Sequence, residues 1–301
     1  MPISIFMIKK WYRMLTGRSV SHITQDVGKC YSTKQILGYY NDFTGKVKYT
    51  KTFTKEGIPL VLVDTGEEVV FSIAVFQFGL GAYDLYLLTN KQEYLVKAEL
   101  CAQWAVNNQM PNGAWDTFYF DKTLSHYSAM AQGEGISLLL RIYQETNDNS
   151  YLLAASKAVE FMLLPVDKGG VTEYIGDKVI FLEYINKPAV LNGWIFSLWG
   201  LYDYIKICPK IYLMNLYDKA IKTLVVELPN YDLGFWSKYD LGKTIASPFY
   251  HRLHIAQMEA MFKITKNKQF LNIKKNFTFY LNNKFYFCIA FIRKAIQKIL
   301  E

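Results

Sequence analysis

The chain has 301 residues, of which 51% are hydrophobic and 16% aromatic, and its formal net charge is +8. Length alone favours about two domains, but the apolar content is ample for one sizeable core. No stretch reaches about 18 uncharged apolar residues, so the sequence predicts no membrane-spanning helix. The modest basic excess favours an anionic partner, and we expect that partner not to be nucleic acid.

The first residues and the cysteines indicate the expected compartment. Residues 1–20 contain Lys9, Lys10 and Arg13 around a short apolar start and show no small-residue cleavage site, so we expect no signal peptide. The four cysteines are scattered and form no CxxC pair, which indicates reduced thiols. We therefore expect a cytoplasmic protein that has no metal site and no cofactor.

In chain order, residues 1–70 come first; they are polar with scattered aromatic residues, and we interpret them as an irregular N-terminal arm that wraps the rest. From residue 71 the sequence repeats. Segments 89–95, 146–152 and 265–271 resemble one another, and a more divergent copy begins at Cys208. Each copy is typical of the end of an apolar helix, a tight polar turn, and a more amphipathic second helix that starts with an aromatic residue.

The repeat predicts an inner ring of four apolar helices, each followed by an outer helix. The inner helices are expected at Ile73–Leu88, Ala129–Glu145, Leu191–Lys206 and His254–Thr265. Small residues such as Gly79, Gly133 and Gly193 occur in their early turns and allow neighbouring helices to approach closely. The pattern predicts an all-α fold, an (α/α) toroid or barrel over residues 71–283, and a plain helical solenoid is the alternative.

The connections between hairpins are long, at about 108–128, 165–190 and 229–252. Long loops in a compact domain are usually functional, and toroid geometry brings all three out at the same end. In the second loop a small β-hairpin is expected around Gly176-Asp177. Residues 284–301 are expected to form a basic amphipathic helix. An ordinary docked terminal helix and a peripheral contact with an anionic membrane both fit its pattern, and a homodimer is also left open.

Candidate reactive side chains gather where the long loops end. Glu183 and Tyr184 precede one apolar helix, Tyr239 and Tyr250 precede another, and Tyr127 precedes a third. A glycosidase normally needs two acids that flank the bond, and the other acids near these loops are poorly placed for that role. Phenols suit proton transfer at a carbon next to a carboxylate, because they are protonated at neutral pH. Further candidates are Gln132, Glu134, Asn192 and His251.

Several segments at these loops also resemble the C-terminal domain of the D-glucuronyl C5-epimerases. The resemblance covers about residues 71–271 and is carried by Tyr127-Ser128-Ala129-Met130-Ala131-Gln132-Gly133, Glu183-Tyr184, Leu191-Asn192-Gly193 with Gly200-Leu201-Tyr202-Asp203, Tyr231-Asp232-Leu233-Gly234, Tyr239-Asp240-Leu241, and Tyr250-His251 with His254-Ile255. It implies an (α/α)-barrel enzyme that converts D-glucuronate to L-iduronate in heparosan-like polysaccharides without a redox cofactor. We expect a short form without the β-sandwich that the animal enzymes carry before the barrel.

The resemblance also implies roles for individual residues. It puts Glu183 and Tyr184 at one side of the sugar ring, Tyr250 at the other, and Tyr239 close to the substrate carboxylate. The family usually has an arginine after its Tyr-Asp-Leu motif, where this chain has Gly242. Two nearby cations are the expected substitutes, and the full set of expected substrate-binding residues is Tyr127, Gln132, Asn192, His251, Arg252 and Lys243.

The sequence therefore leads to the hypothesis of a uronate C5-epimerase that acts on an anionic, glucuronate-containing polysaccharide or its lipid-linked precursor. Glu183 acts as the base or orients Tyr184, and Tyr250 transfers the proton on the opposite face. Two alternatives stay open: a polysaccharide lyase on the same fold, and a carbohydrate-binding scaffold without catalysis.

Overall fold

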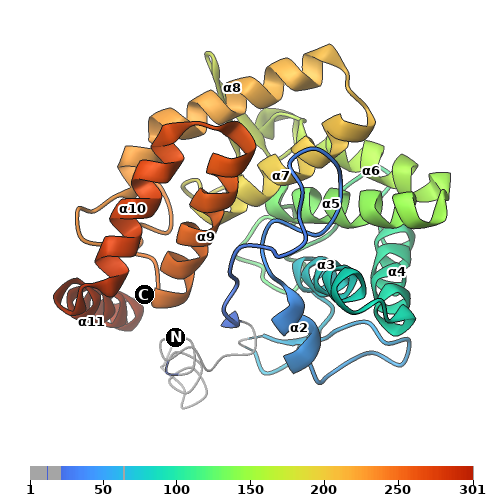
Figure 1. Ribbon diagram of the computed structural model, residues 1–301, viewed down its shortest axis with the longest axis horizontal. Coiled ribbons are helices and arrows are strands. Elements are labelled where there is room, and N and C mark those ends of the chain that lie inside the picture. Colours follow the sequence, from blue (N-terminus) through green and yellow to red (C-terminus); the bar gives the residue numbers. More distant parts are fainter. Residues whose placement is uncertain (1–11, 13–21, 64, 301) are drawn as a thin grey trace.

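Four helical hairpins, each with an inner and an outer helix, form the body of the protein (Figure 1). The computed structural model describes residues 12, 22–63 and 65–300. The pairs are α3 (Ser72–Thr89) with α4 (Gln92–Asn107), α5 (Ala129–Thr146) with α6 (Asn149–Met162), α7 (Leu191–Ile207) with α8 (Ile211–Glu227), and α9 (Pro248–Thr265) with α10 (Lys268–Asn282). The inner helices pack in chain order, α3 on α5, α5 on α7, and α7 on α9. The predicted all-α barrel of hairpins is confirmed.

The polar turn has the same structure in three of the four hairpins. Asn90, Asn147 and Lys266 follow their inner helices with φ values of 55°, 56° and 58°, the left-handed conformation that commonly ends a helix. The threonine before each of them donates its hydroxyl to the carbonyl four residues earlier. In the other hairpin Cys208 has φ −124° instead, so the divergent sequence copy also has a divergent turn.

Glycines let α5 and α7 come into close contact. A Cβ atom on Gly200 would lie 2.3 Å from the carbonyl oxygen of Gly133, and one on Gly133 would lie 2.5 Å from the carbonyl oxygen of Phe196. No side chain fits at either position without separating the helices. The expected role of small residues in the inner ring therefore holds for this helix pair.

The last inner helix begins earlier than the sequence prediction placed it. We expected it from His254, but α9 begins at Pro248, with Ser247 as the N-cap residue whose hydroxyl accepts from the Tyr250 backbone N–H at 3.4 Å. A serine cap followed by proline at the first helical position is a strong helix start. Tyr250, His251 and Arg252 therefore lie in the first turns of a helix and not on a loop.

The extended structure is small. Strands β1 (Val61–Leu62) and β2 (Glu68–Val69) form one antiparallel pair, and β3 (Thr172–Ile175) and β4 (Lys178–Phe181) form another. The second pair is the hairpin expected around Gly176-Asp177. Two 3-10 turns, η2 (Val166–Lys168) and η3 (Leu228–Tyr231), begin the second and third long connections.

Three aromatic residues of the N-terminal arm are buried against the inside of the barrel. Tyr39, Tyr40 and Phe43, just before the short helix α2 (Thr44–Tyr49), are fully buried. The ring of Tyr39 lies 6.3 Å from that of Phe196 and 5.7 Å from that of Trp199, both on α7. These aromatic residues pack into the interior of the barrel, because burying them removes a large apolar area from water.

The arm contacts both the first and the last inner helix, and in Figure 1 it runs between α3 and α9. The carbonyl oxygen of Phe43 approaches Gly81 of α3 so closely that a Cβ atom there would lie 2.3 Å away. On the other side, Lys263 of α9 places its Nζ 5.8 Å from the centre of the Tyr31 ring. Residues 1–11 and 13–21 of the predicted arm lie outside the described residues.

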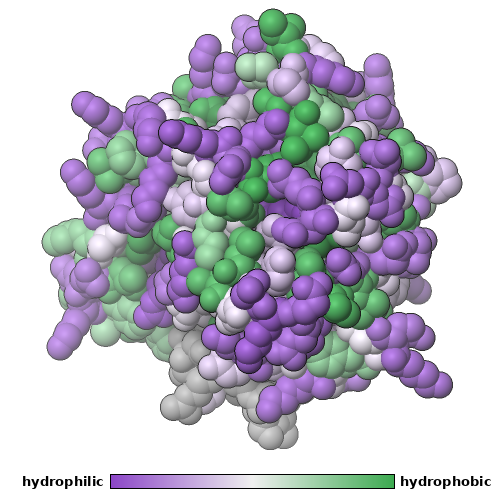
Figure 2. Space-filling view, turned by 45° about the vertical axis from the view of Figure 1, so that its right-hand side comes forward, coloured by the Kyte–Doolittle hydropathy of each residue, from purple (hydrophilic) through white to green (hydrophobic). Residues whose placement is uncertain are grey.

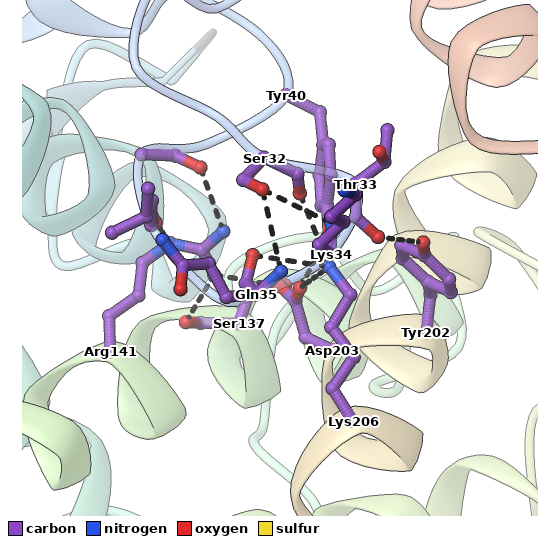
Figure 3. A network of polar contacts seen from close by, with 12 residues as sticks. Ser32, Thr33, Lys34, Gln35, Tyr40, Ser137, Arg141, Tyr202, Asp203 and Lys206 are labelled. Carbon is purple, nitrogen blue, oxygen red and sulfur yellow. Dashed lines mark hydrogen bonds and ion pairs between the residues drawn. The ribbon is translucent and has the colours of Figure 1, made fainter.

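A buried ion pair fixes the arm to the barrel (Figure 3). Arg141 of α5 and Asp203 of α7 are 2.7 Å apart and almost completely buried. The Arg141 guanidinium also donates to the backbone carbonyls of Leu37 and Gly38 at 2.7 and 3.1 Å. Asp203 accepts from the Tyr40 hydroxyl at 2.5 Å. Burial works against the charged guanidinium, but Asp203, Tyr40 and Asp84 together outweigh it and hold the pKa of Arg141 above its ordinary value.

The predicted C-terminal helix is present as α11 (Lys284–Leu300), and residue 301 lies outside the described part. Its inward side includes Ala290 and Lys294, which are buried. None of the helices in the described ranges is long and apolar enough to cross a membrane. Figure 2 shows a face of the molecule on which hydrophilic side chains predominate around a narrow band of hydrophobic ones.

We expect Arg141→Met to lower the free energy of unfolding by about 3–5 kcal/mol, because it leaves the buried Asp203 carboxylate unpaired. Equilibrium urea unfolding followed by circular dichroism measures the change. Asp177→Asn is the control, because it removes the 3.1 Å pair between two exposed residues, Lys219 and Asp177, and should leave the midpoint unchanged. Equal midpoints for both variants would contradict the role given to the buried pair.

Candidate active site

The long loops meet where the inner helices begin, and backbone hydrogen bonds hold them together. The backbone N–H of Ala129, at the start of α5, donates to the carbonyl of Leu182 at 2.9 Å. The N–H of Leu191, at the start of α7, donates to the carbonyl of Tyr239 at 3.0 Å. The residues next to these bonds, among them Glu183, are therefore held at fixed positions at one end of the barrel.

Glu183 lies two residues after the end of strand β4 and is 5% exposed. Its Oε2 has no hydrogen-bond partner among the described residues, and it lies where a Cβ atom on Gly193 would come within 2.5 Å. Burial raises the pKa of Glu183 to about 7, although the phenols of Tyr184 and Tyr239 stabilise the carboxylate and oppose the rise. A carboxyl group of this kind exchanges a proton near neutral pH.

The three predicted catalytic phenols surround this carboxyl group. The rings of Tyr239 and Tyr250 lie 4.7 Å apart, and Tyr184 stacks on Phe118 at 5.0 Å. Burial raises the pKa of Tyr184 and Tyr239 well above the ordinary value, and the charge of Glu183 adds to the rise. The pKa of Tyr250 is raised for the same two reasons. All three phenols are therefore protonated at neutral pH, and they form hydrogen bonds with Glu183 and with one another. We call these four residues the Glu–Tyr cluster.

A cation that the sequence analysis did not select lies beside the cluster. Lys187 follows Glu183 by four residues on the same loop, and its Nζ lies 5.1 Å from the centre of the Tyr184 ring. The positive charge of Lys187 also acts to lower the pKa of Glu183. The sequence did not mark Lys187 as a site residue, because lysines are common in exposed loops for other reasons.

Glu134 forms a second buried carboxyl group further along the inside of the barrel. It lies on α5 between two glycines, is fully buried, and accepts from Gln77 Nε2 at 3.0 Å. Burial raises its pKa well above the ordinary value, while Gln77 and Lys46 oppose this and Glu183 adds to it. Burial also disfavours the charged form of Lys46, and it lowers the pKa of that lysine to about 8. Lys46 comes from α2, so the arm supplies a cation to the interior that no local sequence pattern indicated.

The fold occupies the polar side-chain groups of Gln132 but leaves those of Asn192 largely unpartnered among the described residues. Gln132 donates to the carbonyls of Gly113 and Ala158 and accepts from the Trp115 N–H at 3.3 Å. It fixes the loop before α5, so no donor is left to bind a substrate. Asn192 is 2% exposed, and its carbonyl oxygen accepts from Gln257. Its side-chain Oδ1 has no partner among the described residues.

His251 points away from the Glu–Tyr cluster. It is fully buried, its ring stacks on Trp236 at 3.7 Å, and its Nε2 lies 2.9 Å from the carbonyl oxygen of Phe277 on α10. Its Nδ1 lies 2.8 Å from the Ser237 hydroxyl. Burial lowers the pKa of His251 to about 3, so the ring is neutral. The structure gives it a packing position between α9 and α10.

The remaining predicted residues lie around the rim. Tyr127 is half-buried and packs edge-on against Phe161 at 5.0 Å. Arg252 is exposed on α9. Lys243 is exposed and lines a groove against α11. At Gly242, where an arginine was expected from the resemblance, a Cβ atom would lie 3.0 Å from Pro188 Cγ, so a side chain fits there only if Pro188 moves.

The described residues contain no group of three or more His, Cys, Asp or Glu side chains that could hold a metal ion.

Comparison with known proteins relates this geometry to a family. A model described as the D-glucuronyl C5-epimerase C-terminus matches residues 119–279, more than half of the chain. The chain is 30% identical to the D-glucuronyl C5-epimerase of Caenorhabditis elegans over 56% of its own length and 32% of that protein. It is 31% identical to an uncharacterised protein of Methanocaldococcus jannaschii over 49% of this chain and 50% of that one. The chain thus spans half or less of these curated relatives.

Solved structures share the fold at low sequence identity. Cellobiose 2-epimerase from Bacillus thermoamylovorans is 11% identical, with a TM-score of 0.57 over 78% of this chain and 66% of that one. An unsaturated glucuronyl hydrolase specific for heparin is 13% identical, with a TM-score of 0.51 over 76% of each chain. At these identities the likeness extends to the helical barrel.

Glu183→Gln should make the protein more stable than the parent at high pH, and the difference should grow with pH. The folded parent holds the proton up to a pKa of about 7, whereas the unfolded chain releases it near 4.5. The parent therefore loses stability as pH rises between these values, by about 3 kcal/mol in total.

Urea unfolding of both proteins from pH 4 to pH 8 measures this difference. Glu173→Gln, which changes an exposed glutamate on β3, is the matched control and should give a difference that does not vary with pH. A constant difference for Glu183→Gln as well would mean that its carboxyl group has an ordinary pKa.

Proposed function

The chain belongs to the D-glucuronyl C5-epimerase family, and from this premise we propose that it is a uronate C5-epimerase. The enzyme removes the C5 proton of a D-glucuronate residue and returns a proton to the opposite face, which gives L-iduronate. The observation that carries the proposal is the Glu–Tyr cluster: one buried carboxyl group with a pKa of about 7, surrounded by three protonated phenols.

Glu183 serves as the base in this proposal. A general base is most effective when its pKa lies near the working pH, because it is then ionised often enough and still binds a proton well. Burial supplies this property to Glu183. Tyr250 comes from a different hairpin, at the start of α9, and supplies the proton on the other face of the ring. The C5–H electron pair passes into the adjacent carboxylate, and the new C5–H bond takes it back.

Tyr184 and Tyr239 stabilise the charge that develops on the substrate carboxylate. Removing the C5 proton places a second negative charge on the two carboxylate oxygens, and neutral phenols that are already in position can donate hydrogen bonds to them. Tyr239 is held by the backbone bonds that join its loop to the start of α7. Such donors lower the barrier because they need no reorientation during the reaction.

Lys187 binds the substrate carboxylate in this proposal, in the role that the family gives to an arginine. It is the cation whose charge acts on Glu183, and it lies over the Tyr184 ring. Lys243 instead lines the groove against α11. A lysine makes a point contact with a carboxylate where an arginine makes a planar two-bond contact, so Lys187 holds the substrate less rigidly.

The proposed substrate is an anionic polysaccharide that contains glucuronate, such as a heparosan-like chain or its lipid-linked precursor, in the cytoplasm. The net charge of +8 favours its approach. Tyr127, which is half-buried, offers an aromatic face of the kind that stacks on sugar rings.

We expect the protein to introduce deuterium at C5 of heparosan in heavy water and to produce iduronate, both measured by nuclear magnetic resonance. Glu183→Gln and Tyr250→Phe should each slow the exchange by about 100-fold or more, because each removes a group that transfers the proton. Tyr212→Phe is the matched control, because that phenol is 57% exposed on the outer helix α8, and it should exchange at the parent rate.

Other outcomes of this experiment assign other functions. An unsaturated, ultraviolet-absorbing product would mean that the C4 substituent is eliminated, which identifies a lyase. Binding without exchange, across several uronate polymers, would identify a scaffold and would overturn the proposal.

The rate of exchange should rise with pH and level off above about pH 7, because Glu183 must be ionised to accept the proton and burial holds its pKa at about 7. The measurement is kcat/KM for C5 exchange from pH 5 to pH 8.5. A rate that is already constant at pH 5 would assign the base to a group with an ordinary carboxyl pKa and not to Glu183.

A further inference from the structure

Helix α11 presents an exposed apolar stripe along one side. Phe285, Ile292, Ile296 and Ile299 are 68%, 57%, 51% and 62% exposed. Their spacing of seven, four and three residues puts them on one helical face, opposite the buried side that holds Ala290 and Lys294. At 1.5 Å per residue the stripe is about 21 Å long. Isolated exposed apolar residues are ordinary, but a continuous row of this length indicates a binding surface.

Positive charge accompanies this stripe. Lys284 and Arg293 are exposed on the same helix, and the helix has no acidic residue. Residues 260–300 contain nine Lys or Arg and no Asp or Glu, and two of these lysines, Lys263 and Lys274, pair with Glu259. A helix with an apolar face and flanking basic residues is the arrangement that lies in the interface of an anionic membrane.

A groove next to the stripe has the same chemistry. Its volume is about 430 Å³, and it is lined by Leu233, Lys243, Ile245, Arg293, Ile296, Gln297 and Leu300. The walls are mainly apolar, and the charged residues among them are both cations. An amphiphile with an apolar chain and an anionic head group fits this combination, because the chain contacts the walls while Lys243 and Arg293 meet the head group.

We propose that α11 and the adjoining groove dock onto the surface of an anionic lipid bilayer. The basic charge around the stripe favours an anionic lipid as its partner over another apolar protein surface. A second copy of the chain would bring two basic surfaces together, and residues 1–21 of the same chain contain two lysines and two arginines but no acidic residue. Like charges repel in both cases, whereas anionic head groups attract this surface.

Docking here would fix the Glu–Tyr cluster relative to the bilayer. Gln297 of α11 accepts from the backbone N–H of Ile245 at 3.2 Å, and Phe287 packs against Trp236 at 5.7 Å. Ile245 and Trp236 belong to the loop that carries Tyr239. The helix is therefore joined to the wall of the candidate site and not to a separate part of the molecule. The proposal itself depends on no assumption about the reaction.

Co-sedimentation with sucrose-loaded vesicles tests the proposal on the full chain. We expect binding to vesicles of equal parts phosphatidylcholine and phosphatidylglycerol, little binding to phosphatidylcholine alone, and weaker binding as salt is raised. The double variant Ile292→Glu/Ile296→Glu should reduce partitioning by about tenfold or more, because it places carboxylates in the apolar stripe. Arg293→Glu should reduce it in anionic vesicles specifically.

Ile211→Glu is the matched control. Ile211 is 77% exposed at the start of α8, away from the stripe, so this variant has the same chemistry at a different place and should bind as the parent does. Equal binding to neutral and anionic vesicles, no binding, or unchanged binding of the double variant would overturn the proposal. A concentration-dependent dimer that the double variant abolishes would overturn it too, because it would assign the stripe to a second copy.

Discussion

The structure depends on the buried ion pair between Arg141 and Asp203. Two charges removed from water are costly unless each finds nearly all of its hydrogen bonds, and here the guanidinium and the carboxylate do so with groups from α5, α7 and the arm. The pair therefore specifies where the arm lies. An arm shifted by one residue would lose the carbonyls of Leu37 and Gly38 as partners and would leave part of the guanidinium unpaired.

The position of the arm in turn determines the electrostatics of the candidate site. Once residues 37–40 are fixed, Tyr39 and Phe43 fill the middle of the barrel, and α2 brings Lys46 toward Glu134. The interior is then closed on one side by aromatic rings and at the other end by the long loops. Water is excluded from Glu183, which is the main cause of its raised pKa. The ion pair between Arg141 and Asp203 near one end of the barrel thus contributes to the burial that raises the pKa of Glu183 near the other end.

Local patterns in the sequence were sufficient to predict the hairpins, because the residues that form each turn lie within the sequence of that hairpin. Asn90 and Asn147 end their helices in the left-handed conformation, which asparagine tolerates. The recurrence of this turn along the sequence also revealed the length of the repeating unit. The Glu–Tyr cluster was predictable for a related reason, since its members all lie at the ends of connections that the repeat had located. The start of α9 was wrong by six residues, although Ser247-Pro248 is itself a strong helix signal.

The surroundings of other residues could not be predicted, because their partners are remote in sequence. Gln132 and His251 looked available, but each is occupied by groups that only the tertiary fold brings near, Gly113 and Ala158 for one and Phe277 for the other. Lys46 could not be predicted, because its effect on Glu134 spans 88 positions. Lys187 lies only four residues from Glu183, but it was not identified from the sequence because lysines are common in exposed loops.

The arm has a further consequence for the order in which the molecule is made. Its aromatic residues leave the ribosome before the barrel helices, and their packing surface on α7, around Phe196 and Trp199, is synthesised more than 150 residues later. Contacts of such long range form late and slow the search for the native state. During that interval Tyr39, Tyr40 and Phe43 stay exposed, so the stretch that completes the barrel is also the one most open to capture by a chaperone or to aggregation.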